Sequence, residues 1–122
     1  MLLNFYKRLE IKEGQVIWPV NPSRNFIKNL KSNVPKNCSV PFNYPGEPVD
    51  IIIYWLEKKD SLSEVLADLK DKFKTALWIV QPKTGSNTIP EAVREIANSQ
   101  NMIASKIADF TLGEYGTRFV NK

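Results

Sequence analysis

The chain has no histidine and only one cysteine, Cys38. The absence of histidine excludes Ser-His-Asp and Cys-His catalysis and any metal triad built on histidine. A single cysteine excludes an internal disulfide and a zinc site made of several thiolates. We therefore predict no catalytic residue set and no metal site.

Long apolar segments are missing too, since no run approaches the roughly 20 residues that a membrane-spanning helix needs. Residues 1–6 are mostly apolar, but they are too few for a signal peptide and no basic segment precedes them. These features predict a cytoplasmic protein with no membrane partner.

Charge is not concentrated anywhere in the sequence. The 17 basic and 13 acidic side chains give a net charge of +4, and the basic residues are spread along the chain. Scattered charges are typical of a solvated mixed surface, whereas a nucleic-acid interface needs them gathered on one face. We therefore do not expect nucleic acid as a partner.

The stretch from residue 48 to residue 85 organises the rest of the sequence. Residues 51–56 are continuously apolar, which indicates a strand covered on both faces, as in a parallel sheet between helix layers. Apolar residues then recur at helical spacing over 61–73, and residues 76–80 form a second buried strand. This strand–helix–strand unit predicts a right-handed βαβ crossover.

Local signals define the helix boundaries and the weaker strands. Ser61-x-x-Glu64 is a capping box, in which the hydroxyl and the carboxylate each accept a backbone N–H. Pro19 and Pro41 remove backbone donors, so their strands should end there or lie at sheet edges. The other predicted elements are strands at 15–20, 38–42, 102–110 and 117–120, helices at 23–32 and from residue 88, and a short amphipathic helix within 1–13.

These elements predict an α/β protein with a three-layer, Rossmann-like, mostly parallel sheet and an antiparallel C-terminal strand. The loop before the last strand is too short for a crossover helix, which is why that strand should be antiparallel. We expect one domain over residues 1–122, with 1–13 as a lead-in segment that packs on it.

Ligands of open α/β sheets bind beyond the carboxyl ends of the strands. The polar segment after the second buried strand offers a cation, hydrogen-bonding groups and a flexible glycine, followed by a helix N-terminus. It could hold a phosphate or carboxylate, and the alternative is a plain polar turn with a helix cap. The candidate ligand-binding residues of this segment are Gln81, Lys83, Thr84, Gly85, Ser86 and Asn87.

Three further side chains are weaker candidates. Trp18 and Trp55 lie in predicted strands, where a core role is the alternative to contact with a ligand; Trp55, near a strand end, could line a pocket. Arg118 could reach an anion, or it could be an ordinary surface arginine.

The first strand lacks the glycine-rich turn of nucleotide-binding folds. It continues as Trp-Pro-Val-Asn-Pro over residues 18–22, and a bulky, proline-locked backbone should keep a cofactor at a distance. We therefore expect no cofactor, and the sequence argues against S-adenosylmethionine.

Three sets of residues resemble the small bacterial proteins grouped as domain of unknown function 3052. They are Leu-x-Ile-Lys-x-Gly-x-Val at 9–16, Asp-Ile-Ile at 50–52 with Trp-x-x-x-Pro-Lys at 78–83, and Gly-Thr-Arg-Phe-Val at 116–120. The resemblance covers about residues 8–121 and implies a pared-down class I methyltransferase fold. It also implies a central first strand and a last strand inserted between the two before it. The family carries no established activity to transfer.

The main functional prediction is therefore a non-catalytic binding or regulatory module, with a small anionic ligand or a protein as its partner. The alternative is a small enzyme with a methyltransferase-like or anionic-ligand site at the carboxyl ends of the strands. A homodimer formed through the edge segments 38–42 and 102–110 is a third possibility.

Overall fold

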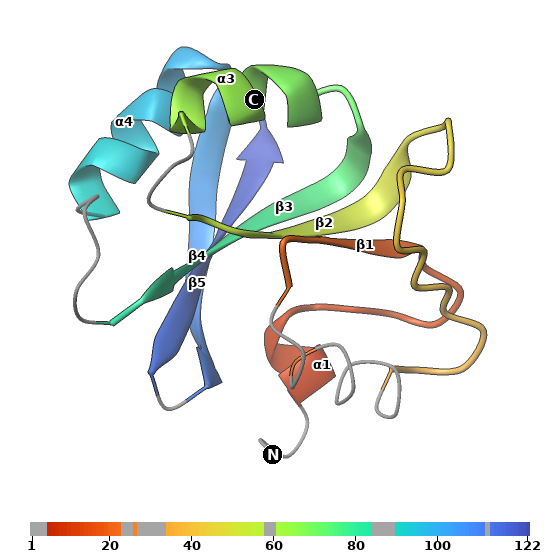
Figure 1. Ribbon diagram of the computed structural model, residues 1–122. Coiled ribbons are helices and arrows are strands. Elements are labelled where there is room, and N and C mark those ends of the chain that lie inside the picture. Colours follow the sequence, from red (N-terminus) through yellow and green to blue (C-terminus); the bar gives the residue numbers. More distant parts are fainter. Residues whose placement is uncertain (1–4, 23–25, 27–33, 58–60, 84–89, 112) are drawn as a thin grey trace.

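The computed structural model describes residues 5–22, 26, 34–57, 61–83, 90–111 and 113–122 (Figure 1). Within these residues, five strands form one sheet in the order β1-β2-β3-β5-β4. The strands are β1 (Ile17–Val20), β2 (Val49–Trp55), β3 (Phe73–Pro82), β4 (Met102–Thr111) and β5 (Glu114–Asn121).

The pairing confirms the predicted α/β fold class. β1, β2 and β3 run parallel, whereas β5 is antiparallel to both β3 and β4. The last strand therefore lies between the two strands that precede it, as the family resemblance implies. The expected central position of the first strand is wrong, because β1 borders the described sheet.

Two prolines explain why β1 gains almost no neighbour on its outer side. Val16 forms an isolated parallel bridge with Ser39, in which Ile17 N donates to Ser39 O over 2.8 Å. The next rung of a parallel ladder would need backbone N–H groups from Pro19 and Pro41, and neither residue has one. The predicted strand at 38–42 is thereby reduced to one bridge, and this edge of the sheet is blunted.

The helices and the lead-in segment cover opposite faces of the sheet (Figure 1). α3 (Leu62–Leu69) and α4 (Pro90–Ser99) pack on one face, over a core that includes Leu66, Val93 and Phe119. α1 (Phe5–Arg8) lies on the other side, and the residues after it, Leu9 and Ile11, are buried in a second core cluster. The molecule thus has the predicted helix–sheet–helix layering.

The second core cluster is rich in aromatic side chains. Trp78 is fully buried, and its Nε1 donates to the backbone O of Leu9 over 3.1 Å, so the lead-in segment is tied to the middle of the sheet. Phe110 stacks on Phe26 at 5.4 Å between ring centroids and meets Trp78 edge-on at 5.6 Å. These contacts make the face opposite α3 and α4 a true core rather than a loose cover.

Two local predictions differ from the structure. The helix predicted to reach Phe73 ends at Leu69, because Phe73 instead pairs with Val49 and opens β3. Ser61 does stand at the N-cap with an extended backbone, but its side chain makes no capping hydrogen bond. The predicted helix at 23–32, apart from the helical residue Phe26, and the predicted start of a helix at residue 88 lie outside the described residues.

Candidate functional site

The carboxyl ends of β1 and β2 meet where the chain changes direction across the sheet. From β1 the chain crosses to Ser39 on the outer side, and it then returns to β2 on the inner side. Ligands of open α/β sheets bind at such a switch point. The residues at this edge are Asn21 after β1 and the pair Leu56 and Glu57 after β2.

Asn21 lies in the turn that leaves β1. Its φ angle is +58°, in the left-handed region that asparagine adopts more readily than most side chains. The segment 18–22, which the sequence predicts to be locked by its prolines, therefore contains a left-handed turn. The chain makes the turn at a residue between the two prolines that suggested rigidity.

Trp55, the last residue of β2, carries an unused hydrogen-bond donor. Its side chain is only 6% exposed and packs edge-on against Phe26, at 4.7 Å between ring centroids, and against Phe110 at 6.2 Å. The indole Nε1 is buried and has no hydrogen-bond partner in the part of the chain that the structure describes. Because an unmet buried donor costs about 1–3 kcal/mol, this N–H is a natural point for a ligand acceptor.

Trp18 does not join Trp55. It lies beside the core on the α3 and α4 face, and its ring is 5.3 Å from that of Tyr44, whereas Trp55 belongs to the core of the opposite face. The two tryptophans that the sequence offers as ligand contacts are therefore separated by the sheet.

The polar side chains at the end of β3 already have partners within the protein. Gln81 is buried, and its Oε1 accepts a hydrogen bond from the Tyr115 hydroxyl over 3.1 Å. Lys83 Nζ lies 3.1 Å from Asp109 Oδ1, so its charge is paired with a carboxylate of the same chain in an exposed ion pair. The other candidates of this segment, Thr84, Gly85, Ser86 and Asn87, lie outside the described residues.

Tyr115 is a functional candidate that the sequence analysis missed. Burial, and then the nearby Glu91 carboxylate, raise the pKa of its hydroxyl, while Arg94 acts in the opposite direction. The hydroxyl is thus a neutral donor at physiological pH, directed at Gln81. Only the antiparallel pairing of Gln81 with Tyr115 reveals this contact, and no local sequence signal could have predicted it.

The described residues show neither a metal-binding cluster nor a membrane-spanning helix. The described residues contain no group of three or more side chains arranged to hold a metal ion. None of the helices in the described ranges is long and apolar enough to cross a membrane.

Comparison with known proteins connects this fold to methyltransferases. No family model and no curated protein sequence matches the chain. A SAM-dependent methyltransferase from Aquifex aeolicus superposes with a TM-score of 0.68 at 16% identity, over 94% of this chain and 86% of that chain. A TehB-like SAM-dependent methyltransferase from Corynebacterium glutamicum gives 0.61 at 12% identity, over 97% and 86%. A complex of LepI with SAH and a substrate analogue gives 0.55 at 11% identity, over 98% and 39%.

These similarities establish the fold and correct one expectation. The chain has the fold of class I SAM-dependent methyltransferases, with a mixed parallel and antiparallel sheet. The expectation of no cofactor, with S-adenosylmethionine argued against, is contradicted, because two structures that superpose on almost the whole chain are SAM-dependent methyltransferases.

Proposed function

We propose that the protein is a small S-adenosylmethionine-dependent methyltransferase whose cofactor site lies at the carboxyl ends of β1 and β2. The observation that supports this most strongly is the buried Nε1 of Trp55, which has no partner among the described residues, at the switch point of a methyltransferase-type sheet. Fold likeness alone is a weak basis for function, so the proposal depends on this donor.

The residues at this edge fit such a cofactor chemically. Trp55 Nε1 can donate to a carboxylate, hydroxyl or ring acceptor of the ligand. The Asn21 turn brings the backbone after β1 round at the same edge. Glu57 adds a carboxylate beyond β2, which suits the hydroxyl and ammonium groups of S-adenosylmethionine. When bound, the cofactor supplies an electrophilic methyl group, and the chain's task is to hold it at this edge where an acceptor can approach.

Isothermal titration calorimetry with S-adenosylmethionine and S-adenosylhomocysteine tests the proposal. We expect binding to the unchanged protein and an affinity about 3- to 10-fold weaker for Trp55→Phe, the value of one neutral hydrogen bond. Trp18→Phe is the matched control and should bind normally, because Trp18 lies on the other face of the sheet. No heat from either ligand, with the protein folded, would refute the proposal.

The main prediction from the sequence, a non-catalytic module without a cofactor loop, gives a different result in the same assays. Such a module would bind a small anionic ligand or a protein and not S-adenosylmethionine, whereas the proposed enzyme binds S-adenosylmethionine and releases S-adenosylhomocysteine when a methyl acceptor is present. Membership of the domain of unknown function 3052 family and a cytoplasmic location remain predictions from the sequence.

A further inference from the structure

A second polar site lies at the amino-terminal ends of the parallel strands, whereas Asn21 and Trp55 lie at their carboxyl ends. A pocket of about 320 Å³ is lined by residues of the lead-in segment, of the turn before β1, of the start of β3 and of β5. Its lining residues are Lys7, Glu10, Ile11, Lys12, Gln15, Thr75 and Arg118. Gln15 precedes β1 and Thr75 lies near the start of β3, so the pocket belongs to the amino-terminal edge of the parallel strands.

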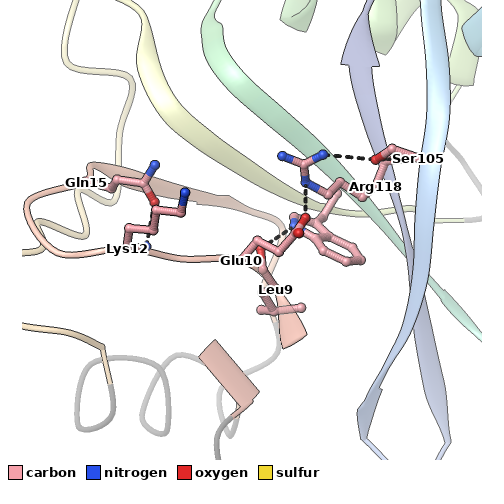
Figure 2. A network of polar contacts seen from close by, with 7 residues as sticks. Leu9, Glu10, Lys12, Gln15, Ser105 and Arg118 are labelled. Carbon is pink, nitrogen blue, oxygen red and sulfur yellow. Dashed lines mark hydrogen bonds and ion pairs between the residues drawn. The ribbon is translucent and has the colours of Figure 1, made fainter. Parts of the chain in front are cut away.

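Arg118 forms the fixed wall of this pocket. Its side chain is only 16% exposed, which is unusual for an arginine and differs from the surface position that its sequence context allowed. The Nε atom lies 3.0 Å from a Glu10 carboxylate oxygen, and one terminal nitrogen, Nη1, donates to Ser105 Oγ over 3.0 Å. In Figure 2 the remaining guanidinium nitrogen points away from Ser105, toward the side where Lys12 and Gln15 lie.

Glu10 and Gln15 are held in place by the backbone around them. Glu10 has a φ angle of +58°, a costly conformation for a non-glycine residue, and its N–H donates to Lys7 O over 3.1 Å. Gln15 Oε1 accepts the Lys12 N–H over 2.8 Å, which leaves the amide nitrogen of Gln15 as a donor (Figure 2). These contacts occupy acceptor oxygens of Glu10 and Gln15, and they leave the Gln15 amide nitrogen as a hydrogen-bond donor in the pocket.

The charge of the lining is unbalanced. Three cations, Lys7, Lys12 and Arg118, face one carboxylate, Glu10. Neither lysine side chain has an ion-pair partner within the described residues. Two positive charges in excess, with an amide nitrogen and the Thr75 hydroxyl nearby, provide the donors that a phosphate group requires.

We propose that this pocket binds a small molecule through a phosphate group. Its volume lies at the lower end of the range for ligand sites, about 300–1,000 Å³, which suits a small phosphate ester better than a nucleic acid. The shared chemistry is the phosphate group, and its source is either free inorganic phosphate or a phosphate monoester. The site is separate from the proposed cofactor edge, so each proposal can fail without the other.

Thermal unfolding with inorganic phosphate, glycerol 3-phosphate and sodium chloride at matched ionic strength tests this proposal. We expect both phosphate compounds to raise the unfolding temperature above the chloride reference, because they bind the folded state. A larger effect of glycerol 3-phosphate identifies the ligand as a monoester, and equal effects identify it as inorganic phosphate. No effect beyond chloride would overturn the proposal.

Variants locate the site. Lys7→Gln with Lys12→Gln should weaken phosphate affinity about 5- to 10-fold, whereas Lys70→Gln with Lys122→Gln removes the same charge outside the pocket and should change affinity less than 2-fold. Equal responses from the two double variants would overturn the proposal.

The Glu10→Gln substitution should change the phosphate affinity in the opposite direction. It removes the one negative charge of the pocket while keeping an oxygen that can accept from Arg118, so phosphate should bind about 2- to 5-fold more tightly. Heteronuclear NMR should place the phosphate-induced shifts at the backbone amides of Gln15 and Thr75. Weaker binding by Glu10→Gln, or shifts confined to the carboxyl edge, would contradict the assignment.

Discussion

The same substitution at two buried tryptophans should have different costs, because within the described residues only one of their indole N–H groups has a hydrogen-bond partner. Trp78 Nε1 donates to Leu9 O over 3.1 Å, whereas Trp55 Nε1 has no partner among the described residues. Both rings are buried in the same aromatic cluster, Trp78 fully and Trp55 to 6% exposure. Trp→Phe therefore removes a similar ring from each site but a hydrogen bond from only one.

The difference between the two variants can be estimated from these contacts. The loss of ring volume costs about 1–3 kcal/mol at either position and largely cancels in the comparison. Trp78→Phe also leaves Leu9 O without this donor, which adds about 1–3 kcal/mol, whereas Trp55→Phe removes a donor without a partner among the described residues and so relieves a cost of about 1–3 kcal/mol. The variants should therefore differ by about 2–6 kcal/mol, and at roughly 4 °C per kcal/mol for a domain of this size Trp78→Phe should unfold about 8–24 °C below Trp55→Phe.

Thermal and urea unfolding, followed by circular dichroism without added ligand, measure this difference. Urea unfolding should give equal m-values for the two variants, so that a shift in midpoint reports stability alone. Equal losses of stability, or a larger loss for Trp55→Phe, would refute the reasoning. Trp55 Nε1 would then have a partner inside the protein, and its proposed role toward a cofactor would fall with it.

Two further predictions concern β5. Gly116→Ala should lower the free energy of unfolding by about 1–3 kcal/mol in urea titrations, because an added Cβ would overlap the ring of Phe110; an unchanged midpoint would mean that the ring moves aside freely. Burial raises the pKa of Tyr115 above its usual value of 10.0, so the folded state holds this proton more tightly than the unfolded state. That contribution to stability is complete below pH 10 and is lost as the pH rises through the folded-state pKa, so wild-type stability should fall more steeply there than that of Tyr115→Phe. Parallel pH profiles of the two proteins would contradict it.

The fold class was readable from local patterns, and its topology was readable in part. The continuous apolar run at 51–56 requires cover on both faces of the sheet, and that requirement holds whatever the neighbouring strands are. The edge position of β1 depends on a nonlocal fact: Pro19 and Pro41 come to the same rung of hydrogen bonds only once Val16 pairs with Ser39. Each proline alone suggested an edge, but the sequence did not show that both would remove the same rung.

The candidate site was predicted less well, for reasons of the same kind. Lys83 looked like an anion contact until the fold brought Asp109 of β4 within 3.1 Å of it. The unmet donor of Trp55 is a property of its surroundings, so its sequence position could suggest a pocket but not a missing partner. The turn after β1 could have been predicted from Asn21, because asparagine is a residue that tolerates a left-handed conformation.

The most direct test of the central proposal is the NMR signal of the three tryptophan indole N–H groups during a titration with S-adenosylmethionine. We predict that the Trp55 signal moves to lower field as its N–H gains an acceptor, and that the Trp78 signal stays in place because that N–H is already bonded to Leu9 O. Saturating S-adenosylmethionine with no movement of the Trp55 signal would contradict the proposal that this edge of the sheet holds the cofactor.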